Sequence, residues 1–433
     1  MDALPLTREA ALALDAADGL ASYRDQFCLP QAHANGQHVV YLCGHSLGLQ
    51  PKIVRDYIDE ELQDWAALGV EGHFHARRPW LSYHETLTAQ TARLVGAKPV
   101  EVVVMNSLTV NLHLMLVSFY RPTPERFKIL IEADAFPSDR YAVESHLKWH
   151  GYDPQEALVT LQPRSGEATV RQEDMAAILH REGETIALIW LGGVNYYTGQ
   201  VFDMAAITAI GHAQGCVVGF DLAHAAGNII LQLHDWDVDC AVWCSYKYLN
   251  AGPGAAAGCF VHERYAKRPD LPRLAGWWGH HKDTRFQMPE HFDPILGAEG
   301  WQISNPPILQ LAALRASMSL FDRAGMAPLR AKSERLTGDL AASLKRLIHD
   351  RTLPGATLIT PDDPAQRGAQ LSLQMAQHGR ALHQRLSEAN IICDWREPDV
   401  IRVAPVPLYN TFLDVLTFIN ALETAHREVL VSA

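Results

Sequence analysis

The sequence predicts an α/β protein with a large domain built on a mainly parallel sheet and a smaller α+β domain. Three observations predict this class. Short apolar runs recur through the middle of the chain, helical patterns separate several of them, and long helices follow the paired prolines of "NPPILQ". Continuous apolar runs are typical of strands buried on both faces, and their alternation with helices favours a parallel sheet. With 433 residues, 48% of them hydrophobic, the chain is long enough for two domains.

The strands expected in the large domain are apolar runs of four to seven residues. They are "VVVM" from 102, "KILIEA" from 128, "IALIWLG" from 186, "CVVGFD" from 216, "DCAVWC" from 239 and "AAGCFVH" from 256. Helices are expected between them, for example in "SDRYAVESHLKWHG" from 138 and "DMAAITAIGHAQG" from 203. We assign residues 61–307 to this domain and residues 1–60 to an amino-terminal segment that contributes to the small domain.

The small domain is expected over residues 308–433. Helical patterns cover about 308–323 and 326–349, after the break at Pro306 and Pro307. Strand candidates follow in "QLSLQM" from 370, "IICDW" from 391 and "VIRVAP" from 400, before a last helix near 410–427. This order of elements predicts an α+β unit.

Charge and cysteine content narrow the class of partner. The formal net charge of -12 argues against nucleic acid or an anionic membrane surface, because both attract clustered Lys and Arg. No segment has the ~18 uninterrupted apolar residues of a membrane span. The 7 cysteines are scattered without a CxxC pair, which is typical of reduced thiols in a cytoplasmic protein rather than a disulfide or metal site. We expect a soluble, cytoplasmic protein that binds a small molecule and no metal.

Lys247 is the most informative residue. It follows a strand candidate in "AVWCSYKYLNAGPG", between two tyrosines, where a surface lysine is not expected. Asp221 ends the preceding strand candidate in "GFDLAHAAGN", and His224 follows it. Asp221 alone reads as a helix cap, but the carboxyl end of a parallel strand is also where such sheets bind ligands. A lysine joined to an acid for a pyridinium nitrogen is the arrangement that pyridoxal phosphate needs, so Lys247 is expected to hold a cofactor covalently.

Two further stretches are candidates for the same site. "VVVMNSLTVNLHLML" predicts strand, turn and helix, so the N–H groups around Ser107, Leu108 and Thr109 would point toward an anion such as a phosphate. In "EADAFPSDRYA", Phe136 would stack on a cofactor ring and Asp139 would bond near it. Each stretch taken alone is also compatible with a structural role, as a helix cap or a core aromatic.

The sequence resembles the kynureninase family, pyridoxal-phosphate hydrolases of the aspartate-aminotransferase-like fold, also called fold type I. The resemblance runs almost end to end. It rests on "SLGLQP", "RRPW", "NSLTVNLHLM", "AFPSD", "YYTGQ", "GFDLAHAAGN", "WCSYKYLNAG", "GWWGH", "ISNPPI" and "IRVAPVPLYN". Two positions depart from the family pattern: His45 in "GHSLG" stands where asparagine is usual, and Arg140 follows "FPSD" where histidine is frequent.

The resemblance implies a role for each candidate in the cofactor site. Lys247 would bind the cofactor, Asp221 would pair with its ring nitrogen and His224 would support Asp221. Tyr246 would bond the phosphate and transfer protons, although simple phosphate binding is an alternative. The other residues of the implied cofactor site are Leu108, Thr109, Phe136, Asp139, Gly192, Trp277 and Asn305.

The same resemblance implies a homodimer that hydrolyses the Cβ–Cγ bond of a kynurenine. Trp277 and Asn305 would come from the partner subunit, and the amino-terminal segment would contribute to the active-site entrance. Arg402 would bind the substrate α-carboxylate, since its planar fork suits a carboxylate and an unpaired arginine in "VIRVAP" would be costly. Either a ligand or a buried acid would pair with the charged guanidinium group of Arg402.

The resemblance also implies which residues surround the aryl ring of the substrate. Ser46, His73, Ser304 and Asn305 match positions that favour a 3-hydroxyl group, so 3-hydroxykynurenine is expected, on the route to NAD. His73 as an outlying surface histidine is the alternative. A cysteine desulfurase or small aminotransferase would share the fold, because fold does not fix function. A protein that binds a cofactor or partner without catalysis is the other rival.

Overall fold

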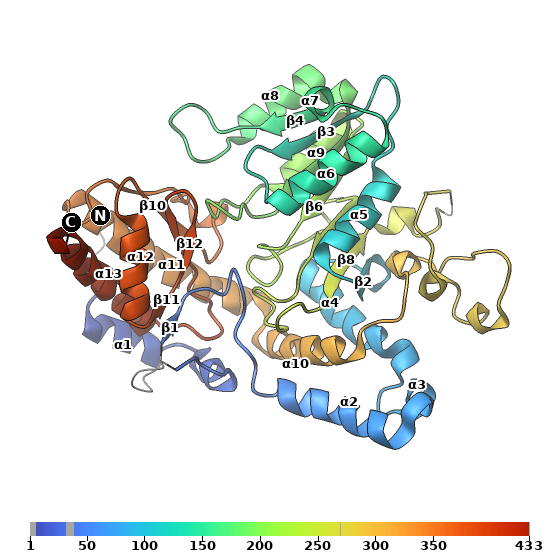
Figure 1. The fold of residues 1–433 in the computed structure, drawn as a ribbon, viewed down its shortest axis with the longest axis horizontal. Coiled ribbons are helices and arrows are strands. Elements are labelled where there is room, and N and C mark those ends of the chain that lie inside the picture. The colour runs from blue at the N-terminus through green and yellow to red at the C-terminus, as the bar shows by residue number, and fades with distance from the viewer. Residues whose placement is uncertain (1–5, 32–38, 269, 433) are drawn as a thin grey trace. The chain divides into compact units, whose positions relative to one another are not determined.

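The computed structural model describes residues 6–31, 39–268 and 270–432 (Figure 1). The chain divides into two compact units, which we describe separately. One unit comprises Met1–Ile53, Tyr197–Val201 and Leu320–Ala433, and the other comprises Val54–Tyr196 and Phe202–Ser319. These boundaries lie at 53 and 319, compared with the expected 60 and 307, and the short stretch Tyr197–Val201 joins the first unit.

The larger unit contains a seven-stranded sheet with the order β2-β8-β7-β6-β5-β3-β4. Its strands are β2 (Val102–Met105), β3 (Lys128–Glu132), β4 (Leu158–Leu161), β5 (Ile186–Gly192), β6 (Val217–Asp221), β7 (Cys240–Trp243) and β8 (Ala257–Val261). Neighbouring strands from β4 to β7 pair in parallel, whereas β8 runs antiparallel to both β7 and β2. The expected mainly parallel α/β sheet is confirmed.

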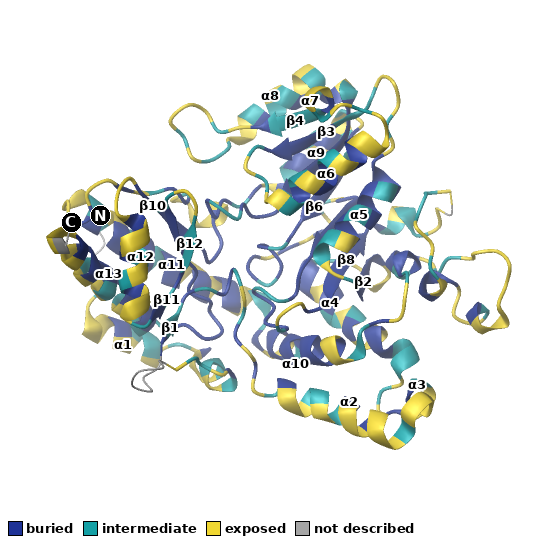
Figure 2. Cartoon of the chain, viewed as in Figure 1, coloured by how far each residue is buried: buried dark blue, intermediate teal, exposed yellow. Residues whose placement is uncertain are grey.

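The larger unit also contains helices, several of which pack on this sheet, and Figure 2 shows buried strands beside helices with exposed outer faces. They are α2 (Val54–Leu68), α3 (Gly72–His75), α4 (Thr88–Val95), α5 (Leu108–Phe119), α6 (Pro137–Trp149), α7 (Pro154–Ala157), α8 (Gln172–Glu182), α9 (Met204–Ala213) and α10 (Ile308–Ala324), the last of which continues past the unit boundary. Local signals explain several starts: Pro137 opens α6, and the Asp203 carboxylate accepts a hydrogen bond of 3.0 Å from the Ala206 N–H at the start of α9.

The strands β3, β5 and β6 place three residues of interest at one edge of the sheet. Glu132, Gly192 and Asp221 are the last residues of these strands, which are neighbours in the order β6-β5-β3. Gly192 pairs in register with Asp221. Because parallel strands end at the same edge, this edge is where an open α/β sheet binds its ligand.

The smaller unit combines helices with two small sheets. Its helices are α1 (Arg8–Ala16), α11 (Met326–His349), α12 (Gly379–Glu388) and α13 (Phe412–Ser432). An antiparallel sheet has the order β12-β13-β10-β9, formed by β9 (Ala356–Leu358), β10 (Leu371–Met375), β12 (Asp394–Arg396) and β13 (Val400–Val403). A parallel pair joins β1 (Val40–Tyr41) to β11 (Ile391–Ile392). The helices and sheets share one apolar core that includes Leu340, Leu373 and Phe418.

Two details differ from the sequence expectation. The run "IICDW" is divided between β11 and β12, which belong to different sheets. The strand β4, which pairs with β3, was not expected, because only Leu161 of its four residues is fully buried and the run is not continuously apolar. Among the described residues, no helix is long and apolar enough to cross a membrane.

Candidate active site

Lys247 lies just after β7, in a polar and aromatic setting within the larger unit. Its Nζ atom lies 3.0 Å from Nε2 of His224. The same atom lies 5.8 Å from the centre of the Phe136 ring and 5.9 Å from that of the Tyr246 ring. At these distances both rings attract the ammonium group through their π faces. The structure thus brings Lys247, His224, Phe136 and Tyr246 together.

Asp221 supplies the anionic part of this site. It ends β6, the strand next to β7, and one of its carboxylate oxygens accepts a hydrogen bond of 2.7 Å from the Ala223 N–H. Burial raises the pKa of Asp221, while the Ala223 N–H and the positive charge of Lys247 oppose the rise. A buried carboxylate with a cation in its field is suited to hold a protonated nitrogen.

Asp139 forms a pair with Asp221. It lies in the first turn of α6, is buried, and shares a side-chain hydrogen bond with Asp221. Burial raises the pKa of Asp139 well above its ordinary value, and the negative charge of Asp221 raises it further. Asp139 therefore holds a proton and donates to Asp221, which remains the anion. Among the described residues, the Asp139 Oδ1 atom is buried without a hydrogen-bond partner, so it has a hydrogen bond to offer to a further polar group.

The start of α5 offers a set of donors. Leu108 is its first residue, and Ser107 takes an extended conformation before it, with no capping bond from its side chain among the described residues. The hydroxyl Oγ1 of Thr109 lies 2.8 Å from Oγ of Ser138, which lies in α6 beside Asp139. N–H groups of a first helical turn together with two hydroxyls are the donors that a phosphate binds.

Tyr246 adds a phenol to the site. Burial raises its pKa above the ordinary value for tyrosine, and the neighbouring thiol of Cys244, to which its side chain hydrogen-bonds, contributes to the rise. The hydroxyl therefore keeps its proton at neutral pH. It can donate a proton to a reacting atom or a hydrogen bond to a phosphate.

Sequence reasoning missed Glu132 and Asn195 in this region. Glu132 ends β3 and is buried, and its Oε2 accepts a hydrogen bond of 2.8 Å from Nδ2 of Asn195. A Cβ atom at Gly192 would lie 2.9 Å from Oε1 of Glu132, so only glycine fits there without movement. The signal that identifies Glu132 is an acid closing a buried strand, as Asp221 closes β6.

Among the described residues, the structure places four other predicted residues of the larger unit in local settings that include no contact with Lys247. Nδ1 of His73 lies 3.0 Å from the carbonyl oxygen of Val70, and its ring lies edge-on to Trp80. Trp277 is 46% exposed and its ring contacts Trp278 and Phe286. Ser304 and Asn305 are both exposed, in the loop before α10. Arg140, a departure from the family pattern, bonds Glu144 in the next turn of α6, with 2.8 Å between Nε and Oε1.

The remaining predicted residues, Ser46 and Arg402, belong to the smaller unit. Arg402 is buried in β13, and its Nε donates a hydrogen bond of 2.7 Å to Asp394 in β12. Burial lowers the pKa of Arg402, and Asp394 opposes this effect. The acid partner that sequence reasoning allowed is therefore present, although Asp394 is only partly buried. Ser46 is half-buried, and the neighbouring His45 is fully buried.

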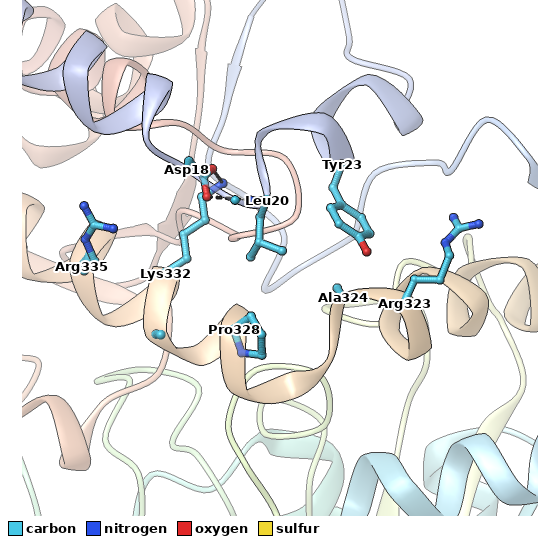
Figure 3. Close-up of a pocket in the computed structure, with 10 residues that line it drawn as sticks. Asp18, Leu20, Tyr23, Arg323, Ala324, Pro328, Lys332 and Arg335 are labelled. Carbon is cyan, nitrogen blue, oxygen red and sulfur yellow. Dashed lines mark hydrogen bonds and ion pairs between the residues drawn. The ribbon is translucent and has the colours of Figure 1, made fainter.

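The smaller unit also contains a pocket of about 460 Å³ (Figure 3). Its wall includes Leu20, Tyr23 and Pro328, with Arg323 and Arg335 at its rim. Nζ of Lys332 lies 2.7 Å from Oδ2 of Asp18 on the same wall. None of the predicted site residues is among those that line this pocket.

The donor set around Lys247 fits pyridoxal phosphate. A primary amine, an anion for a ring nitrogen, an aromatic ring and a phosphate-binding helix start come from neighbouring elements of one sheet. Solved structures share the fold: an apo cysteine desulfurase from Thermococcus onnurineus NA1 superposes with a TM-score of 0.74 at 16% identity, covering 90% of this chain and 95% of that one. The cysteine desulfurase CsdA from Escherichia coli gives a TM-score of 0.75 at 17% identity, covering 95% and 99%. The chain therefore has the fold of the fold type I enzymes, and the residues around Lys247 suit the pyridoxal phosphate that such enzymes bind.

Sequence relatives define the family. The chain is 62% identical to a kynureninase of Myxococcus xanthus (strain DK1622) over 96% of both chains, and 59% identical to a kynureninase of Koribacter versatilis (strain Ellin345) over 96% of this chain and 97% of the relative. A family model described as the kynureninase C-terminal domain matches residues 329–422. The chain belongs to the kynureninase family, whose members hydrolyse a carbon–carbon bond. The desulfurases share its fold but not this family.

Proposed function

We propose that this chain hydrolyses the Cβ–Cγ bond of L-3-hydroxykynurenine, and also of L-kynurenine. The products are L-alanine with 3-hydroxyanthranilate or anthranilate. The observation that carries the proposal is the contact of Lys247 with His224 beside the Asp139–Asp221 pair, in a chain 62% identical to a kynureninase.

The residues of the larger unit would hold the cofactor as follows. Lys247 binds it covalently, and Asp221, as the charged member of its pair with Asp139, holds the ring nitrogen in its protonated form. Phe136 lies against the ring, since it lies 5.8 Å from Nζ of Lys247 and is 43% exposed. The phosphate is bound by the N–H of Leu108 and the hydroxyl of Thr109. Gly192 completes this shell, and His224 supports Asp221 from the position beside Lys247.

Bound pyridoxal phosphate supplies an electron sink for charge that develops on substrate carbons. Around it, the chain supplies proton transfer and charge. The amine of Lys247, once released, accepts the proton from Cα and returns it elsewhere on the substrate. Tyr246 keeps its proton at neutral pH, which suits it to donate that proton to the carbon that leaves and to assist the addition of water to the γ-carbonyl. Phosphate binding alone is the second role open to Tyr246.

The substrate-binding residues are assigned by their chemistry. Arg402 binds the α-carboxylate, and its bond to Asp394 supports this by fixing the orientation of the guanidinium fork. The 3-hydroxyl group of the aryl ring is bound by the polar side chains of Ser46, His73, Ser304 and Asn305. A site built to bond a hydroxyl rejects a ligand that lacks it, because its own polar groups are then left unpaired.

A homodimer is part of the proposal. Trp277 and Asn305 would be lent to the active site of the partner subunit. Support comes from apolar side chains exposed over the same segment of the larger unit, namely Leu274, Trp277, Phe286, Met288, Phe292 and Leu296. Exposed apolar residues gathered in one segment are typical of a subunit interface.

The biological setting follows from the preferred substrate. We place the reaction in the degradation of tryptophan through kynurenine and, through the hydroxylated product, in the de novo synthesis of NAD. A cytoplasmic location agrees with 7 cysteines that are all free thiols.

The test is turnover of L-3-hydroxykynurenine and L-kynurenine side by side, with added pyridoxal phosphate. A higher kcat/KM for the hydroxylated substrate is expected. A preference for plain kynurenine would overturn the roles of Ser46, His73, Ser304 and Asn305 as readers of the hydroxyl. Turnover of neither would overturn the proposal as a whole.

A further inference from the structure

Three buried acids lie close enough to share one electrostatic field in the larger unit. Asp221 ends β6, Asp139 lies in the first turn of α6, and Glu132 ends β3. Asp139 and Asp221 are joined directly by a hydrogen bond, and the charge of Glu132 acts on Asp139. The proposed function gives no role to Glu132.

The Glu132 carboxyl is fixed in place from two sides. Its Oε2 accepts from Nδ2 of Asn195 at 2.8 Å, and the backbone N–H of Gly192 also donates to the carboxyl. The carboxyl occupies the space that a side chain at position 192 would need, because a Cβ atom at Gly192 would lie 2.9 Å from Oε1. Gly192 in turn pairs in register with Asp221. Glu132 is thus held against the strand that separates it from Asp221.

The charges that face Glu132 are mostly negative. Asp221 and the exposed Asp134 act on it directly. Lys247 is the cation that acts on both Asp139 and Asp221. Burial, followed by these negative charges, raises the pKa of Glu132 to about 7, against the opposing hydrogen bonds from Asn195 and Gly192. Several buried acids in one field cannot all be ionised together, so the charge of one decides the protonation of the next.

We propose that Glu132 is a positioning residue, whose carboxylate keeps the proton on Asp139 so that Asp139 donates to Asp221 and Asp221 remains the charged partner. The inference rests on the proposed pairing of Asp221 with the ring nitrogen of the cofactor. When Glu132 and Asp221 are both ionised, a third negative charge on Asp139 is disfavoured, so the proton stays between Asp139 and Asp221. When Glu132 is neutral, that constraint is relaxed.

The test uses the holoenzyme and its Glu132→Gln variant, which keeps the shape of the side chain and removes its charge. Infrared difference spectra recorded against pH follow the band of protonated carboxyl groups. We expect the wild type to lose such a band with a midpoint at about pH 7. Glu132→Gln should lack this transition. The control Glu184→Gln, which changes an exposed acid of the same unit, should keep it.

The second measurement is the visible absorbance of the bound cofactor against pH. In Glu132→Gln its midpoint should fall by about one pH unit, because loss of a nearby negative charge weakens proton binding by every group in the same field. Asn195→Ala provides an independent variant. It keeps the acid but removes a donor to its anion, so the infrared midpoint should move to higher pH.

Two results would overturn the positioning role. One is an infrared transition that persists in Glu132→Gln, since another group would then be titrating. The other is loss of that transition with an unchanged absorbance midpoint, since Glu132 would then be a buried acid without influence on the cofactor. Failure of the underlying pairing is recognised separately: Asp221→Asn would bind pyridoxal phosphate with wild-type affinity and the wild-type absorbance profile.

Discussion

Nζ of Lys247 and Nε2 of His224 lie 3.0 Å apart, within hydrogen-bond distance. A lysine ammonium has no lone pair, so it donates to this nitrogen when Nε2 carries no hydrogen. The His224 imidazole thus accepts a hydrogen bond from Lys247. The orientation of the imidazole ring therefore fixes the direction in which the lysine amine points. Substitutions at either residue should therefore affect the chemistry before they affect the fold.

Lys247→Ala is expected to abolish turnover and the visible absorbance of the covalently held cofactor. The amine that binds the cofactor and accepts the Cα proton is lost, and no neighbouring side chain replaces both functions. Absorbance spectra and single-turnover assays measure the two effects. Lys148→Ala, which removes an exposed lysine of α6, is the matched control and should behave as the wild type. Retained turnover in Lys247→Ala would contradict the assignment.

Arg402→Ala is expected to raise KM by roughly 100-fold while the bound cofactor stays stoichiometric, because two charge-assisted hydrogen bonds to the α-carboxylate are lost. Arg402→Lys should recover only part of the loss, since an ammonium lacks the planar fork. Arg396→Ala is the control, because Arg396 also pairs with Asp394, with 3.3 Å between Nη2 and Oδ2. Loss of cofactor from Arg402→Ala would instead indicate a structural role.

The free energy of unfolding should depend on pH in a way that reflects the raised pKa of Glu132. The carboxyl is neutral in both states below its unfolded pKa of 4.5, and the folded state retains the proton up to about pH 7. The unfolded state releases its proton first as pH rises, so this contribution to stability is lost between pH 4.5 and 7. Relative to Glu132→Gln, the wild type should lose about 3 kcal/mol over this window.

Denaturant titrations at a series of pH values measure this difference. Acids that lie outside the electrostatic field of Glu132 titrate alike in both proteins, so their contributions cancel in the comparison. Parallel curves for the wild type and Glu132→Gln would show that the folded-state pKa of Glu132 is not raised.

The shared active site can be tested by mixing two inactive variants. If Trp277 serves the partner subunit, a heterodimer of Lys247→Ala and Trp277→Ala contains one complete site. Random exchange of subunits should then restore roughly a quarter of the wild-type activity. The control pair is Lys247→Ala with His224→Ala, which should restore nothing, because both residues belong to the same site in one chain. If the first mixture recovers no activity, Trp277 does not contribute to the active site of the partner subunit.

Much of the fold was predictable because the strands of the larger unit are continuous apolar runs. The run "GFD" ends on Asp221 as β6 does, and "VVVM" coincides with β2. The edge strand β4 was missed because most of it is only partly buried, so its sequence lacks a continuous apolar run. The division of "IICDW" was also beyond sequence reasoning, since the partners β1 and β13 lie far apart in the chain.

The candidate site was predictable where one residue carries a specific chemistry. Lys247, Asp221 and His224 stood out by type and position, and the structure places them on neighbouring strand ends. Glu132 did not stand out, because an acid after "KILI" resembles any polar residue that ends a strand. Its importance depends on burial and on Asn195, 63 positions away in the sequence. Such long-range contacts are not encoded in any local pattern.

The missing side chain at position 192 has a consequence for the evolution and engineering of this enzyme. The space that a methyl group would need is taken by Oε1 of Glu132, 2.9 Å from where that carbon would stand. Positions 132 and 192 are therefore coupled: a larger residue at 192 requires a smaller residue at 132. A library that randomises position 192 alone will mostly recover glycine, whereas joint variation opens combinations such as alanine at 192 with aspartate at 132.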